Sequence, residues 1–276
     1  MDLLYGLLPW EFSPTVILVV AATAIAYGRG SIRRPCGVWR QIAFWSGLAL
    51  IYIALQTQVD YYAEREFFIH RLQHLVLHHL GPFLIMLASP GPALRAALPL
   101  AWRIRLRRGF SRLPALRILL DVLLNPWVAA FMFFGIIYLW LWPSLHFIAM
   151  LDWRIYRLMN WSVTVDGLLF WWLVLDRRPH PPARLAPGVR VFISLIVAVP
   201  QILIGAYITF TRRDLFPLYD LCGRAFAGIS ALRSQQIGGL ILWIPSAMMS
   251  VLGALVAMSH WISLSSRGRL RGRRAA

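Results

Sequence analysis

The sequence predicts an all-α, polytopic membrane protein in which seven transmembrane helices form a single domain over residues 1–276. Hydrophobic residues make up 59% of the chain, charged residues only 14%, and the mean hydropathy is +0.63. This composition is typical of a chain that exposes apolar side chains to lipid. Apolar stretches of bilayer-spanning length also recur along the chain. The predicted spans are approximately 14–28, 39–58, 67–89, 122–142, 161–175, 190–210 and 237–258.

The distribution of arginine predicts the orientation of these helices. All 28 basic residues are arginines, and most lie in connections on one side of the membrane and in the tail 261–276. The other arginines are balanced by acidic residues in the opposite connections. By the positive-inside rule, the N-terminus is outside and the C-terminus is cytoplasmic. Because the net charge of +17 follows membrane sidedness, it does not indicate a nucleic-acid partner.

The loop 90–121 is predicted to be cytoplasmic and strongly basic. It mixes Trp102, Ile104 and Leu106 with arginines. A segment of this kind lies along a membrane surface and binds anionic headgroups, so we expect membrane lipid as one partner.

The third predicted helix contains four histidines in an otherwise apolar sequence. Ionisable groups at membrane depth are costly and usually face the interior of a helix bundle. Four residues advance an α-helix by about 400°, so His70, His74 and His78 form one stripe, with Glu66 one turn further out. His79 points about 100° away from His78. Imidazoles in register beside a carboxylate predict a metal or haem site near the outer face.

Two further potential ligands, His146 and Met150, lie in the outer connection after the fourth predicted helix. Imidazole nitrogen and thioether sulfur together suit Cu(I), which is a soft ion, so copper is the expected metal. The predicted metal ligands are His70, His74 and His78, with Glu66, His146 and Met150 as weaker candidates.

Asp166 lies inside the fifth predicted helix, where a lone carboxylate must be paired or protonated. Its predicted partner is the histidine stripe or Gln201 of the sixth helix. A proton or ion relay and a helix-pairing role both remain open. In the third helix, Gly81-Pro82 predicts a kink, because proline removes a backbone donor.

Several catalytic patterns are missing from the sequence. There is no Walker loop, dinucleotide glycine fingerprint, Gly-x-Ser-x-Gly elbow or His-Glu-x-x-His motif. These absences argue against a hydrolase or an ATP-driven pump. We therefore expect no catalytic residues and no enzymatic activity.

Short motifs spread over residues 67–255 carry a family resemblance. They include Phe68-Ile-His-Arg-Leu-Gln-His-Leu, Gly167-Leu-Leu-Phe-Trp-Trp172 and Ile237-Gly-Gly-Leu-Ile-Leu-Trp-Ile-Pro245. In order and spacing, the chain resembles the CtaG family of membrane assembly factors for caa-type cytochrome c oxidases. The resemblance implies a bacterial inner-membrane protein that helps mature the copper-containing core of a haem–copper oxidase. It also implies oxidase subunits or other copper chaperones as partners, and it matches His70 and His74 to paired histidines of the family.

The chain departs from the family pattern at three polar positions. Leu141 stands where the family often has a histidine, and Asn160 lies where a Glu-His pair often opens the fifth span. Ser234 replaces an acidic residue before Gly-Gly of the seventh span. Either His78, His146 and Met159 compensate for these losses, or the metal function has changed or been lost.

The leading hypothesis is therefore an assembly factor or metallochaperone at the outer membrane face, which presents copper or holds an oxidase subunit during copper insertion. One alternative is a haem-binding electron-transfer protein, which would need opposed histidines on separate helices. Another is a transporter for a metal or small solute, in which Asp166 and Gln201 would line the path.

Overall fold

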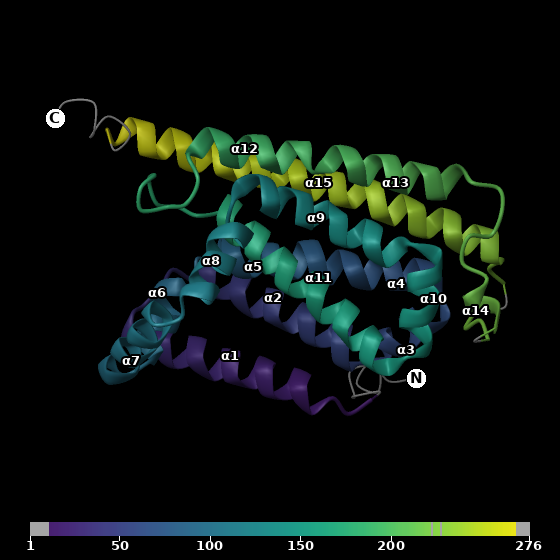
Figure 1. Cartoon of the computed structure of the whole chain (residues 1–276), viewed down its shortest axis with the longest axis horizontal. Helices are drawn as coiled ribbons and strands as arrows, with labels where there is room; N and C mark the ends of the chain where they lie inside the picture. Colours follow the sequence, from purple (N-terminus) through teal and green to yellow (C-terminus); the bar gives the residue numbers. More distant parts are fainter. Residues whose placement is uncertain (1–10, 222, 227, 269–276) are drawn as a thin grey trace.

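The long helices run side by side along the longest dimension of the molecule (Figure 1). The computed structural model describes residues 11–221, 223–226 and 228–268, and these ranges contain helices and loops but no strand. Part of the predicted basic tail 261–276 lies outside the described residues. Within them, the all-α prediction is confirmed.

Each of the seven predicted spans corresponds to one or more helices. The third span consists of α4, η2 and α5 in succession, and the sixth consists of α12 and α13. The segments are α1 (Pro14–Arg33), α2 (Val38–Gln56), α4 (Phe67–His74), η2 (Leu75–Leu80), α5 (Gly81–Leu87), α9 (Pro126–Leu141), α11 (Trp153–Val174), α12 (Pro187–Ile196), α13 (Ala198–Phe210) and α15 (Ala231–Ser266). Further helices lie in the connections, namely α3 (Gln58–Arg65), α6 (Gly91–Ala97), α7 (Leu100–Ser111), α8 (Pro114–Leu123), α10 (Pro143–Leu151) and α14 (Leu218–Leu221).

The described residues contain four to six candidate membrane spans. Four are long and apolar enough by themselves: α1, α2, the α12–α13 pair and α15. Two more qualify only as bent pairs, in which the third-span helix turns into α6 by 74° and α8 turns into α9 by 73°. The remaining predicted span, α11, is not among them; it carries Arg154, Arg157 and Asp166. Seven spans therefore remain a prediction.

The connections between the long helices lie at the two ends of the bundle (Figure 1). At one end, here called the outer end, α3, α10 and α14 gather near the start of the described chain. At the other, the inner end, lie α6, α7 and α8, together with the C-terminal end of α15. The connections fall into the same two groups as in the arginine-based prediction, and which end faces the cytoplasm stays a prediction.

Side-chain caps begin three of the long helices. The Asn125 side chain accepts hydrogen bonds from the first turn of α9, and Asp152 does the same for α11. Ser230 accepts the N–H of Arg233 at the start of α15. Each cap satisfies a backbone donor that has no partner within the helix.

Large apolar side chains project from the outside of the bundle. Leu18, Phe131, Leu203, Met248 and Ile262 are all exposed, and they come from four different helices. Apolar surface on this scale marks contact with a membrane or another protein. On α8, none of the residues is buried.

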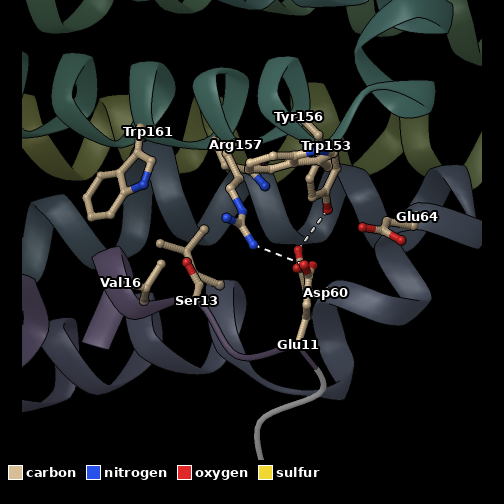
Figure 2. A pocket seen from close by; sticks show the side chains of 11 residues that line it. Glu11, Ser13, Val16, Asp60, Glu64, Trp153, Tyr156, Arg157 and Trp161 are labelled. Atoms are coloured by element: carbon tan, nitrogen blue, oxygen red, sulfur yellow. Dashed lines mark hydrogen bonds and ion pairs between the residues drawn. The ribbon is translucent and has the colours of Figure 1, made fainter. Parts of the chain in front are cut away.

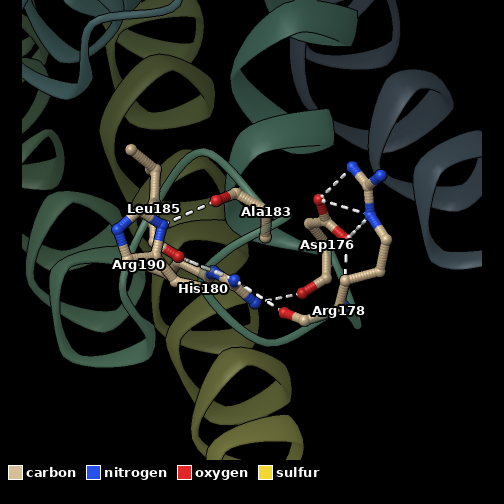
Figure 3. A network of polar contacts seen from close by, with 6 residues as sticks. All are labelled: Asp176, Arg178, His180, Ala183, Leu185 and Arg190. Atoms are coloured by element: carbon tan, nitrogen blue, oxygen red, sulfur yellow. Dashed lines mark hydrogen bonds and ion pairs between the residues drawn. The ribbon is translucent and has the colours of Figure 1, made fainter. Parts of the chain in front are cut away.

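At the inner end, the loop between α11 and α12 is organised around Arg190, which is 1% exposed (Figure 3). Its guanidinium donates to the carbonyl of Leu185, with N···O distances of 3.0 and 2.7 Å, and to that of Arg178 at 2.9 Å. It also donates to the carbonyl of Asp176. This buried cation therefore holds the loop by its backbone oxygens.

Candidate functional site

The third span lies inside the bundle, and all four of its histidines are buried. His70 is 0% exposed, His74 7%, His78 1% and His79 2%. The cost of placing imidazole in lipid explains why these side chains face neighbouring helices.

A π-helix interrupts the predicted histidine stripe. Residues Leu75–Leu80 form η2, in which hydrogen bonds run from i to i+5 and the α-helical spacing of four no longer holds. The histidines instead form two ring pairs. The ring centroids of His70 and His74 are 4.4 Å apart, and those of His78 and His79 are 4.8 Å apart.

Proline and glycine explain the local structure around η2. Pro82 has no N–H, so it donates no hydrogen bond to the carbonyl of His78 four residues earlier. The indole Nε1 of Trp171 donates to that carbonyl at 3.3 Å. Gly167 lies directly against the same group, since a Cβ at this position would be 2.3 Å from the His78 oxygen. The structure thus has a π-helix directly before Gly81-Pro82, where the sequence predicts a kink. The kink itself stays a prediction.

His78 is joined to α11. Its Nε2 lies 2.9 Å from Oδ2 of Asp166, and its ring stacks on Phe133 with centroids 4.1 Å apart. Of the two predicted partners for Asp166, the histidine is confirmed. Neither side-chain polar atom of Gln201 has a hydrogen-bond partner.

His146 comes from α10 and lies beside His70, with ring centroids 5.2 Å apart. Its Nδ1 is 3.0 Å from the carbonyl oxygen of Trp140, and its Nε2 is 3.0 Å from the hydroxyl of Tyr219. A carbonyl only accepts, so Nδ1 carries the proton and Nε2 accepts from the tyrosine. Burial lowers the pKa of His146 to about 3, and the positive charge of Arg71 acts in the same direction. Hence His146 is a neutral ring with both nitrogens engaged.

The two remaining candidate ligands, Glu66 and Met150, make other contacts. Glu66 is 0% exposed and forms an ion pair with Arg224 at 3.0 Å. It also accepts from the hydroxyl of Ser234 at 3.0 Å and from the N–H of Phe226 at 3.2 Å. Met150 is half-buried and packs against apolar clusters.

The histidine pair nearest the outer end has open nitrogens. Neither nitrogen of His70 has a hydrogen-bond partner, and neither does Nε2 of His74. Buried polar atoms are normally satisfied, so these nitrogens are available to a ligand. Within the described part of the chain, no three His, Cys, Asp or Glu side chains are arranged to hold a metal ion. His70 and His74 are thus predicted ligands with open nitrogens, whereas both nitrogens of His146 are engaged.

An acidic pocket at the outer end lies close to this pair (Figure 2). It has an empty volume of about 430 Å³ and is lined by Glu11, Asp60, Glu64, Tyr156, Arg157 and Asn160, among others. Figure 2 shows Tyr156 donating to Asp60, at 2.7 Å, and Arg157 pairing with Glu11, at 3.0 Å. The ring of Tyr156 lies 6.1 Å from that of His70, so Tyr156 lies between the acidic pocket and the histidines.

Burial raises the pKa of Asp60 to about 6, and hydrogen bonds from Tyr156 and Gln73 limit the rise. Burial also raises the pKa of Glu64 to about 7, and the nearby Asp60 and Glu11 carboxylates add to it. Sequence reasoning did not select Asp60 or Tyr156. The available signal was a carboxylate in the short outer helix that immediately precedes the histidine-rich span.

Comparison with known proteins gives a family and two relatives. A family model described as cytochrome c oxidase caa3 assembly factor (Caa3_CtaG) matches residues 20–263. Uncharacterized proteins of Mycobacterium bovis and Mycobacterium tuberculosis are each 24% identical over 276 residues, covering 91% of this chain. The chain spans only 39% of the length of these relatives. No solved structure matches it.

Proposed function

The chain belongs to the cytochrome c oxidase caa3 assembly factor (CtaG) family, and on that premise we propose that it assists copper insertion into an oxidase subunit at the outer membrane face. In this proposal His70 and His74 hold Cu(I) while the subunit is bound. The copper ion is a cargo, and no bond of a substrate is made or broken, which agrees with the non-enzymatic role that an assembly factor family suggests.

The unpartnered nitrogens of His70 and His74 carry the proposal. These two imidazoles lie on one helix, shielded from water, with ring centroids 4.4 Å apart. Imidazole nitrogen suits copper, and three of the four ring nitrogens have no hydrogen-bond partner. Cu(I) accepts two ligands, so a third histidine is not required. His146, beside His70, becomes the third ligand if its Nε2 exchanges Tyr219 for the metal.

The other predicted ligands take supporting roles in this proposal. His78 is held by Asp166 and fixes the inner side of the site. Glu66 fixes the segment around Arg224 over the outer end of α4. The acidic pocket lined by Asp60 and Glu64 attracts cations toward Tyr156 and the histidines.

A haem site receives less support from this geometry. His70 and His146 do come from different helices, as bis-histidine ligation requires. Their rings, however, meet edge to face at 5.2 Å, which leaves no space for a porphyrin between them.

The test is a Cu(I) titration of the purified protein against a competing chelator. We expect one tightly held copper ion per chain, lost in a His70→Ala/His74→Ala variant and retained in His260→Ala, which removes a histidine at the inner end. If the double variant binds copper as tightly as the parent, the site is elsewhere. If the parent binds no copper, a scaffold role in oxidase assembly replaces copper delivery.

A cellular measurement tests the coarser role independently of copper binding. Removing the gene should lower the copper content and activity of the oxidase, and the chain should restore both. Restoration by the histidine double variant would show that assembly does not use this histidine pair.

A further inference from the structure

Arg71 is a buried cation without a carboxylate partner. It follows His70 on α4, is 2% exposed, and forms no ion pair with any carboxylate of the described residues. Its Nε and one terminal nitrogen have no hydrogen-bond partner. The guanidinium lies 5.3 Å from the centroid of the Phe67 ring, a contact that compensates only in part for lost hydration. A buried charge of this kind requires a counter-charge.

Arg71 faces a pocket with an empty volume of about 300 Å³ between the third span, α9, α11 and α15. His74, His78, His79 and Ser246 share the lining with apolar side chains, and no acidic residue contributes to it. The pocket therefore presents a positive charge and polar groups but no negative charge.

Two buried carboxylates that could supply a counter-charge are bound to other groups. The Asp166 carboxylate is bound to Nε2 of His78, and Glu66 is bound to Arg224. Meanwhile several polar atoms at the pocket lack partners. These are Nδ1 of His78 and both ring nitrogens of His79. Unpartnered buried groups around an unpaired guanidinium indicate a polar ligand that is itself negative.

We propose that this pocket binds one small monovalent anion, such as chloride or nitrate, against the guanidinium of Arg71. One positive charge neutralises one negative charge, whereas a dianion would leave an uncompensated charge at low dielectric. The inference goes beyond copper handling and does not rest on it, because Arg71 needs a counter-charge with or without a metal.

Thermal unfolding in lipid nanodiscs, after treatment with a metal chelator, tests the site. Sodium gluconate, chloride, nitrate and sulfate are compared at constant ionic strength. We expect Tm to rise saturably with chloride and nitrate, because an ion that binds only the folded state stabilises it, and not with gluconate or sulfate. Arg71→Gln should lose the chloride dependence, and Arg154→Gln, which alters an exposed arginine of α11, should keep it.

Direct binding keeps the proposal testable if Arg71→Gln does not fold. Equilibrium dialysis of the parent protein with radioactive chloride should find one ion per chain, displaced by nitrate and not by gluconate. Absence of bound chloride, with equal Tm in all four salts, would mean that water fills the pocket and would overturn the proposal. So would a chloride response that persists in a folded Arg71→Gln variant.

Discussion

The imidazole of His78 and the carboxyl group of Asp166 meet inside the bundle, with Nε2 and Oδ2 2.9 Å apart. The two residues are far apart in the chain, and their contact joins η2 to α11. Because His78 is 1% exposed and Asp166 6%, water does not replace either partner. The pair therefore fixes how the third span lies against the fifth.

Asp166→Ala should destabilise the protein by about 1–3 kcal/mol, because it leaves a buried imidazole nitrogen without a partner. Asp166→Asn should cost less, since an amide can still form a hydrogen bond with His78. Thermal unfolding in detergent measures both. As a control, Asp121→Ala breaks an exposed ion pair with Arg184 and should have little effect. Equal losses at the two sites would contradict a structural role for the buried pair.

Gly167→Ala should also destabilise the protein, by about 1–3 kcal/mol, because the new methyl group overlaps the His78 carbonyl. The backbone of η2 would have to move, and the indole of Trp171 would lose its acceptor. In Gly135→Ala the added carbon meets no atom closer than 3.7 Å. That control should be neutral or gain up to about 1 kcal/mol from helix propensity. A stable Gly167→Ala variant would show that the third span adapts to the change.

The carboxylate that pairs with Arg224 should be transferable from position 66 to position 234. Ser234 donates to Glu66 at 3.0 Å, so Ser234→Asp places a second carboxylate beside the first and should lower Tm. Glu66→Gln should lower Tm too, because Arg224 loses its buried counter-charge. In the double variant, Asp at 234 supplies the charge and Gln at 66 the hydrogen bond.

The double variant should therefore be more stable than either single variant, and a double-mutant cycle of Tm values measures the coupling. If the decreases in Tm of the two single variants simply add in the double variant, a carboxylate at position 234 does not replace that of Glu66 as the partner of Arg224. The family resemblance leads one to expect an acidic residue at position 234. Recovery of Tm in the double variant would show that Glu66 supplies this carboxylate in its place.

Asp60 should make stability depend on pH. Its pKa is about 6 in the folded protein and 3.8 as the ordinary value, so the folded state binds the proton more tightly. The free energy of unfolding that protonated Asp60 contributes is then fully present below about pH 4 and is lost as pH rises toward 6 and above. The raised pKa of Glu64, about 7, acts in the same direction over the window from its ordinary 4.5 to 7.

Asp60→Asn isolates this contribution. An amide oxygen at position 60 can still accept from Gln73 and Tyr156 but does not titrate. His146 titrates in the opposite sense in both proteins, because its folded pKa is lowered, so it cancels in the comparison. Between pH 4 and 7, the Tm of Asp60→Asn relative to the parent should rise. A constant difference would show that Asp60 keeps an ordinary pKa.

The amino-acid sequence was sufficient to locate the helices. An apolar stretch of spanning length forms a helix for a local reason, because a backbone in lipid must satisfy its own hydrogen bonds. All seven predicted stretches are helical in the structure. The burial of His70, His74 and His78 also followed from sequence, because an ionisable side chain avoids lipid whichever helix covers it. Motif order likewise led to the family that the comparison shows.

The contacts of each buried side chain could be read only from the three-dimensional structure. An α-helical period predicts a continuous stripe, but η2 divides it, and contacts of His78 with Gly167 and Trp171 accompany that change. Glu66 turns to Arg224, which lies far along the chain. Such pairings depend on packing between distant segments, whereas sequence periodicity reports only which face of one helix is apolar.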